Sequence, residues 1–488
     1  MFDSAELGQT LSAQRYDAEL PELRSKLLQA HFDLRAQKFP VILLVSGADG
    51  AGKGELVHRL NEWLDPRGVE THAFWAQSDE ERERPPFWRY WRSLPGRGRI
   101  GIIFGTWYSQ PIVSRVFGRL KRGEFDAALD RIARFEQMLA DDGALIVKLW
   151  LHLPKKAQKK RLKKLEEEGR LAPDEWKHFK LFDRFTKVSG RALRRTDTGA
   201  APWHVIESTD RRYREITAGN LLLQALRTRI DAAAGAAPRA NGTPADAPPE
   251  VRESILDHVD LSCRLTEAEY ERQLEKLQAA LGKLTWAAWE KKRSMVLVFE
   301  GWDAAGKGSS IRRVTQAIDP RLYRVVGIAA PTDEERAHHY LWRFWRQLPR
   351  AGYTTIFDRS WYGRVLVERV EGFARYEEWS RAYHELNDFE EQLVEHGIVV
   401  NKFWLHVSPQ EQLRRFRERQ KVVHKRYKIT EEDWRNREKW KAYQTAIDEM
   451  VARCSTEYAP WTIVSANDKR HARIQILKTI VGRLRAAL

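Results

Sequence analysis

Short runs of apolar, β-branched and aromatic residues alternate with longer stretches of helical periodicity in the second half of the chain. Strands that alternate with helices predict a mostly parallel sheet with helices on both faces. The predicted strands are MVLVF (295–299), RVVGIAA (324–330), YTTIF (353–357), IVVNKFWLHV (398–407) and WTIV (461–464). This pattern indicates an α/β fold.

The same pattern occurs twice along the chain. The segment ILLVSGADGAGKG (42–54) matches LVFEGWDAAGKG (297–308), so that Lys53 and Lys307 stand 254 positions apart. The same offset aligns many aromatic and charged positions, and it becomes 258 by the pair Trp176 and Trp434, because the second copy holds four extra residues between 406 and 434. A fixed internal repeat of this length indicates two tandem copies of one domain.

An Ala-, Pro- and Gly-rich segment that is poor in large apolar residues separates the copies, as expected of a linker. We therefore predict a degenerate first domain at 1–231, a linker at 232–250 and a catalytic second domain at 251–488. Each copy has the usual size of an independent domain.

The composition predicts a soluble cytoplasmic protein. Of the 488 residues, 42% are apolar and 31% charged, and no apolar run approaches the ~18 to 20 residues of a membrane span. The polar start of the chain does not resemble a signal peptide. Cys263 and Cys454 are too few for a disulfide framework or a zinc site, which fits a reducing compartment.

Lys and Arg number 84 against 68 Asp and Glu, which gives a formal charge of +16. Such a charge predicts a polyanionic partner, and nucleic acid is the default candidate. Charge alone does not distinguish nucleic acid from a narrower polyanion.

A glycine-rich turn follows the predicted strand 295–299 and precedes a helical pattern. A strand, a glycine turn and a helix N-terminus direct backbone N–H groups and the helix dipole at one point, which suits phosphate oxygens. Lys307 is then expected to reach the transferring group. The predicted phosphate-binding residues of this loop are Gly301, Ala304, Ala305, Gly306 and Gly308.

Two aspartates are candidates for a magnesium site. The usual loop ends in Ser or Thr, which binds Mg²⁺, but Gly308 stands there, so another ligand is needed. Asp303 inside the loop is one candidate. Asp358, which closes the run YTTIFD, is the second, in the role of a Walker-B aspartate, and Arg359 and Arg364 follow it.

The stretch RRFRERQKVVHKRYK (414–428) carries eight cations and the single acid Glu418. It follows a predicted strand where P-loop kinases place a mobile lid over phosphates. These cations exceed those needed for a triphosphate and indicate a longer polyanion. Trp342, Trp345 and His406 are expected to be core or interface residues.

These motifs, together with Glu368-Arg369-Val370, Ala459-Pro460-Trp461 and Asn467-Asp468-Lys469, resemble the type-2 polyphosphate kinase family over both halves of the chain. The resemblance implies a P-loop kinase-like three-layer fold related to thymidylate kinase, Mg²⁺ dependence and polyphosphate as donor. It assigns the metal to Asp303 and Asp358, the loop lysine to Lys307 and the post-strand arginine to Arg359. Glu368 matches a glutamate near the nucleotide phosphates, and the lid cations fall on Arg415, Arg419, Lys425 and Lys428.

The tandem arrangement resembles the subgroup that phosphorylates AMP to ADP. We therefore expect inorganic polyphosphate and AMP as partners, a homo-oligomer, and no nucleic acid or membrane. An ATP-dependent nucleotide or small-molecule P-loop kinase is the alternative, and a nucleic-acid-binding ATPase is a second one suggested by the charge.

The two copies differ at the predicted metal site. The partner of Asp358 in the first copy is Phe104, that of Arg359 is Gly105, and that of Glu368 is Ser114. We expect the first copy to be catalytically dead and to serve as a structural partner that retains an intact loop. In the alternative, a water or Asp79 replaces the missing ligand and both copies work.

Overall fold

The computed structural model describes residues 2–171, 174–235, 253–421 and 431–488. Among them, no helix is both long enough and apolar enough to cross a membrane. The predicted lid cations Lys425 and Lys428 lie outside the described residues.

The chain divides into two compact units. One comprises Met1–Gln77, Arg89–Pro238 and Asp333–His339, and the other Ser78–Trp88, Arg239–Thr332 and Tyr340–Leu488. Each unit thus contains one copy of the repeat and a short stretch from the other copy.

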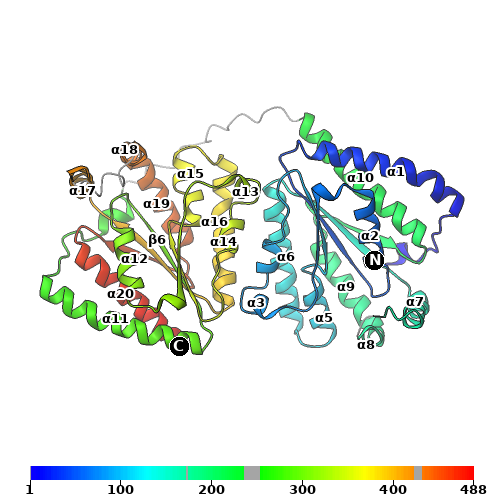
Figure 1. The fold of residues 1–488 in the computed structure, drawn as a ribbon, viewed down its shortest axis with the longest axis horizontal. Helices are drawn as coiled ribbons and strands as arrows, with labels where there is room; N and C mark the ends of the chain where they lie inside the picture. Colours follow the sequence, from blue (N-terminus) through cyan, green and yellow to red (C-terminus); the bar gives the residue numbers. More distant parts are fainter. Residues whose placement is uncertain (1, 172–173, 236–252, 422–430) are drawn as a thin grey trace. The chain divides into compact units, whose positions relative to one another are not determined.

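The first unit contains one five-stranded parallel sheet with the strand order β2-β3-β1-β4-β5. Helices cover both of its faces, with α1, α2 and α10 on one and α5, α6 and α9 on the other (Figure 1). The strands are β1 (Val41–Gly47), β2 (Val69–Ala73), β3 (Ile100–Phe104), β4 (Leu145–His152) and β5 (Trp203–Glu207). The helices of this copy are α1 (Ala13–Leu34), α2 (Lys53–Trp63), α3 (Asp79–Arg82), α4 (Trp88–Trp91), α5 (Ser109–Val116), α6 (Arg122–Asp141), α7 (Lys155–Glu167), α8 (Glu175–Phe179), α9 (Phe182–Thr196) and α10 (Arg211–Gly235).

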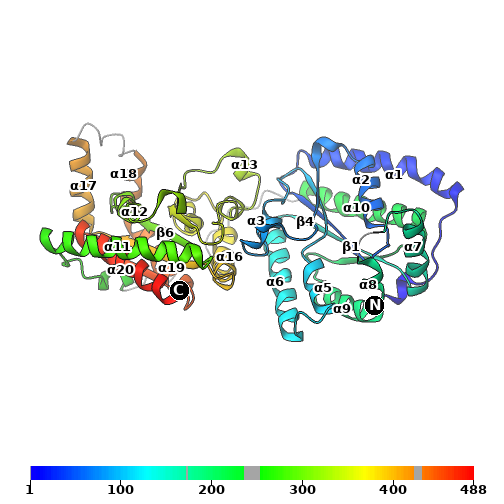
Figure 2. The ribbon, with the colours of Figure 1, turned by 60° about the horizontal axis from the view of Figure 1, so that its bottom comes forward.

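The second unit repeats this architecture, with the order β10-β9-β6-β8-β7 and all pairs parallel. Figure 2 shows α11 and α20 side by side along its sheet. The strands are β6 (Met295–Gly301), β7 (Tyr323–Gly327), β8 (Thr354–Asp358), β9 (Val399–His406) and β10 (Trp461–Ser465). The helices of the second copy are α11 (Glu267–Glu290), α12 (Lys307–Thr315), α13 (Asp333–Arg336), α14 (Trp342–Trp345), the 3₁₀ helix η5 (Trp361–Arg364), α15 (Val367–Val370), α16 (Tyr376–Glu395), α17 (Pro409–Lys421), α18 (Glu431–Glu438), α19 (Trp440–Cys454) and α20 (Lys469–Ala487).

The predicted α/β fold with two tandem sheets is confirmed, and all five predicted strands of the second copy are present. The largest difference is at 324–330, where β7 ends at Gly327 and the chain turns away after one more hydrogen bond, from Ile328 N to Asp358 O at 3.0 Å. Apolarity alone could not mark that end, because the run IAA continues beyond it.

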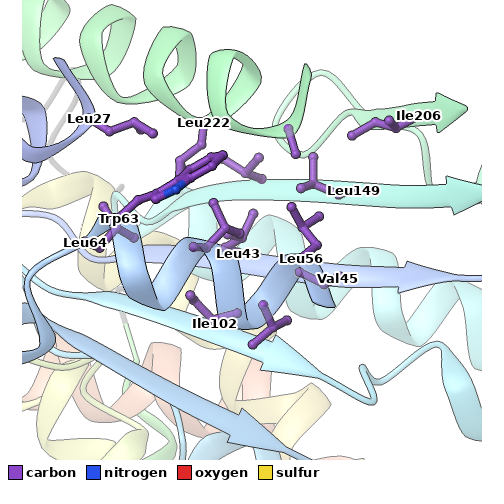
Figure 3. Close-up of a cluster of buried hydrophobic side chains, with 14 of the residues drawn as sticks. Leu27, Leu43, Val45, Leu56, Trp63, Leu64, Ile102, Leu149, Ile206 and Leu222 are labelled. Atoms are coloured by element: carbon purple, nitrogen blue, oxygen red, sulfur yellow. The ribbon is translucent and has the colours of Figure 1, made fainter. Parts of the chain in front are cut away.

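One apolar layer of the first unit lies between the sheet and the helices α1, α2 and α10 (Figure 3). Leu43 and Leu149 from the two central strands meet Leu27, Trp63 and Leu222 from the three helices. Burying each such side chain stabilises the fold by about 1.5–3 kcal/mol. The strands β1 and β3 are almost entirely buried, as is typical of the inner strands of a parallel sheet, and they pair in register up to Val45 and Phe104.

A buried ion pair occurs in both units at equivalent positions. In the second unit, Lys402 Nζ donates to Glu390 Oε2 at 2.6 Å and to Tyr362 Oη at 2.8 Å, while Trp361 Nε1 donates to Glu390 Oε1 at 3.0 Å. The counterparts Lys148, Glu136, Tyr108 and Trp107 make the same bonds in the first unit. Because every buried polar partner is satisfied, this network fixes the chain segment that follows Asp358.

Candidate active site

The phosphate loop of the second copy connects β6 to α12. Three of its residues have left-handed backbone conformations: Gly301 with φ 147°, Ala304 with φ 63° and Gly306 with φ 115°. Glycine is required at 301, because a Cβ there would stand 2.6 Å from the carbonyl oxygen of Leu405. Lys307 Nζ folds back over the loop and donates to Gly301 O at 2.6 Å. The loop therefore has the form that cradles phosphate oxygens.

Asp303 stands inside this loop with two donors on its carboxylate. Arg359 Nη2 donates to Oδ1 at 3.3 Å, and Asn436 Nδ2 from α18 donates to Oδ2 at 3.0 Å. The carboxylate is thus held in one orientation beside the guanidinium that sequence reasoning placed near it. Sequence reasoning missed Asn436, whose counterpart in the first copy is His178.

Asp358 lies at the carboxyl end of β8, next to the start of α12. Its Oδ2 stands 3.9 Å from the point where a Cβ on Gly308 would lie. Gly308 occupies the position at which the usual loop carries a magnesium-binding hydroxyl. The Asp358 carboxylate therefore reaches the space that this hydroxyl would fill.

The donor set fits Mg²⁺. No cluster of three or more His, Cys, Asp or Glu side chains with metal-binding geometry occurs among the residues that the structure describes. Mg²⁺ needs no such cluster, since one or two carboxylates with phosphate oxygens and water satisfy it. Asp303 and Asp358 provide two carboxylates beside the phosphate loop.

Arg359 has a strained backbone. Its φ is 66°, in the left-handed region that side chains other than glycine rarely adopt, and its N donates to Phe299 O at 3.1 Å across to β6. Such a conformation costs about 1–3 kcal/mol and is found mostly where function requires it. In this conformation the guanidinium lies within hydrogen-bond distance of Asp303.

Arg364 and Glu368 form an ion pair at 3.1 Å between η5 and α15. The Arg364 guanidinium also lies over the ring of Tyr340, 4.4 Å from its centroid. The structure thus brings Arg364, predicted to bind phosphate, into contact with Glu368, predicted to be catalytic.

Arg415 stabilises the phosphate loop through hydrogen bonds to its main-chain carbonyl oxygens. The side chain is only 3% exposed, and its guanidinium donates hydrogen bonds within the protein. This engagement favours a supporting role in place of the predicted contact with polyphosphate. The acceptors are the carbonyl oxygens of Ala304, Ala305, Ala466 and Asn467 and the carboxylate of Glu411. Arg419 lies about one helical turn further along α17 and is half-buried.

The expectation that Trp342, Trp345 and His406 are buried is confirmed. Trp302 Nε1 donates to His406 Nδ1 at 3.0 Å, and the Trp302 ring stacks on Trp440 with 3.6 Å between centroids. Burial lowers the pKa of His406 to about 4. The imidazole of His406 is therefore neutral near pH 7 in the folded protein.

We expect the free energy of unfolding to decrease as pH falls from about 6.5 toward 4, because only the unfolded state then protonates His406 readily. The stabilisation is fully present above pH 6.5, and the loss at the acid end is at most roughly 3 kcal/mol. Urea unfolding followed by tryptophan fluorescence measures it. His406→Gln, which keeps an acceptor for Trp302 and does not titrate, should reduce the pH dependence; an unchanged dependence would contradict this origin.

The equivalent site of the first copy lacks the second carboxylate. Strand register pairs Val45 with Phe104 and Phe299 with Asp358, so Phe104 occupies the position of Asp358. Gly105, with φ 76°, replaces Arg359, and a Cβ on it would stand 2.0 Å from the carbonyl oxygen of Phe74.

In the phosphate loop of the first copy, Asp49 and the main chain bind side chains of the same domain. Asp49 accepts from His178 Nδ1 at 2.8 Å and lies 3.5 Å from Lys53 Nζ. Burial raises the pKa of Asp49, but Lys53 and His178 together bring it below its ordinary value. Arg214 from α10 donates to Ala51 O at 3.1 Å and braces the loop as Arg415 does in the second copy.

Comparison with known proteins agrees with this geometry. The family model for polyphosphate kinase 2 matches residues 10–233 and 264–488. The chain is 52% identical over 492 residues to the polyphosphate:AMP phosphotransferase of Pseudomonas aeruginosa, covering 100% of this chain and 99% of that protein. It is 37% identical over 483 residues to the enzyme of the same name from Acinetobacter johnsonii, covering 98% and 97%.

A crystal structure of a protein assigned as polyphosphate kinase 2 from Pseudomonas aeruginosa PA01 superposes with a TM-score of 0.90 at 51% identity. The superposition covers 100% of this chain and 99% of that one. Both copies of the repeat therefore have counterparts in that protein.

Proposed function

Because the chain belongs to the polyphosphate kinase 2 family, we propose that it transfers a phosphoryl group from inorganic polyphosphate to AMP and so produces ADP. The observation that carries this proposal is 52% identity over the full length of a polyphosphate:AMP phosphotransferase. The phosphate loop, the two aspartates and Arg359 of the second copy support it.

We place catalysis in the second copy. Asp303 and Asp358 would hold Mg²⁺, and the chemistry that the ion would supply is neutralisation of charge on the terminal phosphates. Lys307 leaves the carbonyl oxygens of its own loop and reaches the transferring group. In a loose phosphoryl-transfer transition state, negative charge is spread over the three equatorial oxygens of the transferring group. Arg359 neutralises part of that charge.

The attacking atom is an oxygen of the AMP phosphate, which is already ionised near neutral pH. No strong general base is therefore needed, and positioning with charge neutralisation supplies most of the rate. Arg364 and Arg419 are proposed to contact the phosphates of the two substrates, and Glu368, which forms an ion pair with Arg364, is proposed to lie near the nucleotide phosphates. Lys425 and Lys428 are proposed to do so from the lid. The first copy is proposed to be a structural partner without turnover, and self-association of the chain stays a prediction.

We expect purified protein to form ADP from AMP, Mg²⁺ and polyphosphate in the complete absence of ATP. Traces of ATP in the protein and substrate solutions are first converted to ADP with hexokinase and glucose, and ADP formed afterwards is measured by anion-exchange chromatography as the increase over a zero-time sample. A Lys307→Ala protein prepared in parallel controls for contaminating kinases. Formation of ADP only when ATP is supplied would favour the ATP-dependent kinase instead.

A further inference from the structure

A buried carboxyl group lies directly beneath the phosphate loop. Glu300 is the penultimate residue of β6, is only 6% exposed and precedes Gly301. Ser360 Oγ donates to its Oε1 at 2.7 Å, and Ser360 itself is 2% exposed. A carboxyl group is costly to bury, and this hydrogen bond offsets only part of that cost. A carboxyl group at the end of an apolar strand therefore needs a functional explanation.

Ser360 connects this carboxyl group to the catalytic turn. It directly follows Asp358 and Arg359, and its Oγ also accepts from Tyr362 N at 3.3 Å, which caps η5. The hydrogen bond to Glu300 therefore fixes the point where β8 ends and η5 begins. Burial raises the pKa of Glu300, while the bond to Ser360 and the nearby Lys307 and Arg359 act in the opposite direction.

The first copy shows what the fold alone requires at this place. The counterpart of Glu300 is Ser46, that of Ser360 is Thr106, and their hydroxyl oxygens are 2.8 Å apart. Both are buried, so two hydroxyl groups are enough to bridge these strands. The carboxyl group is present in the copy that carries Asp358 and Arg359 and absent from the copy that carries Phe104 and Gly105.

We infer that Glu300 is a positioning residue for the phosphoryl transfer proposed above, on which this inference rests. Through Ser360 it holds the turn that carries Asp358 and the strained Arg359, so that the carboxylate and the guanidinium face the phosphate loop. Glu300 affects the positions of Asp358 and Arg359 and contacts no reacting atom itself. A displacement of about 1 Å in such a group costs about 10²-fold in rate.

The test uses the full chain with Glu300→Ala, Glu300→Gln, Ser360→Ala and the Glu300→Ala/Ser360→Ala double variant. Glu300→Ala and Ser360→Ala should each lower kcat about 10- to 100-fold, with KM for AMP within about threefold of wild type. The double variant should lose no more than Ser360→Ala alone, because Ser360→Ala already removes the bond to Glu300 together with the cap of η5. Glu300→Gln should keep kcat within about threefold, since its amide oxygen accepts from Ser360.

Thr106→Val is the matched control, because it removes the equivalent bridge from the first copy and should leave kcat unchanged. Full activity of Glu300→Ala, equal damage from Glu300→Gln and Glu300→Ala, additive losses in the double variant, or a comparable loss in Thr106→Val would each overturn the inference. Wild-type protein measured in the same series separates the two proposals: if it makes no ADP, the proposed function has failed, whereas active wild type with active Glu300→Ala refutes the inference alone. Should Glu300→Ala not fold, the contrast between Ser360→Ala and Glu300→Gln decides.

Discussion

Asp358→Asn is expected to lower kcat for ADP formation by about 10³-fold while the protein stays folded. The change removes the carboxylate that reaches the space beside Gly308 but leaves the size of the side chain unchanged. The charge lost is one that the transition state uses, so kcat should fall far more than KM for AMP rises. Steady-state kinetics over a range of Mg²⁺ concentrations measures both quantities.

Glu290→Gln controls for the loss of one negative charge, because Glu290 is exposed at the end of α11. Circular dichroism and thermal unfolding verify that both variants fold. Turnover near that of wild type in a folded Asp358→Asn protein would remove Asp358 from the metal site.

The second large effect is a difference between two equivalent lysines. Lys53→Ala is expected to leave kcat within about threefold of wild type, and Lys307→Ala to lower it about 10²- to 10³-fold. Each amine donates to two carbonyl oxygens of its own loop, Lys53 to Gly47 and Ala48 and Lys307 to Gly301 and Trp302. Lys53→Ala also removes the ion pair with Asp49, so its structural loss is at least as large as that of Lys307→Ala, and a larger fall in kcat for Lys307→Ala therefore isolates catalysis.

The reverse outcome would move the active site to the first copy. Comparable losses in both variants would mean that both copies turn over, with water or another residue in place of the missing carboxylate. Asp79 is a poor substitute, since its side chain is 86% exposed and forms an ion pair with Arg82.

The sequence predicted the fold, and it predicted that Arg359 lies beside the phosphate loop, because both depend on local patterns. Apolar runs gave the strands, the glycine loop gave the strand-to-helix turn, and the constant offset gave the equivalence of Asp358 and Phe104, which the strand register bears out. Parallel strands bring their carboxyl ends to one edge, so Asp303 and Asp358 had to lie near each other.

Other contacts depend on tertiary packing that no local pattern encodes. Arg415 belongs to a cationic run, yet it is buried against four carbonyl oxygens, and a charge count cannot separate it from the exposed Arg414 beside it. Its counterpart in bracing the first loop is Arg214, on a different helix and at a different place in the repeat. Glu300 could have been noticed, because aligning the copies sets an acid opposite Ser46 inside a buried strand.

Gly105 has a consequence for any attempt to build a second catalytic centre into this chain. Phe104→Asp would restore a carboxylate, but the arginine that should follow has no room, because its Cβ would stand 2.0 Å from a main-chain oxygen of Phe74. A main-chain atom cannot rotate aside as a side chain does, so the extension of β2 would have to be rebuilt as well. Gly105→Arg therefore requires the main chain at Phe74 to move, and the pair of substitutions Phe104→Asp and Gly105→Arg does not by itself reproduce the site of the second copy.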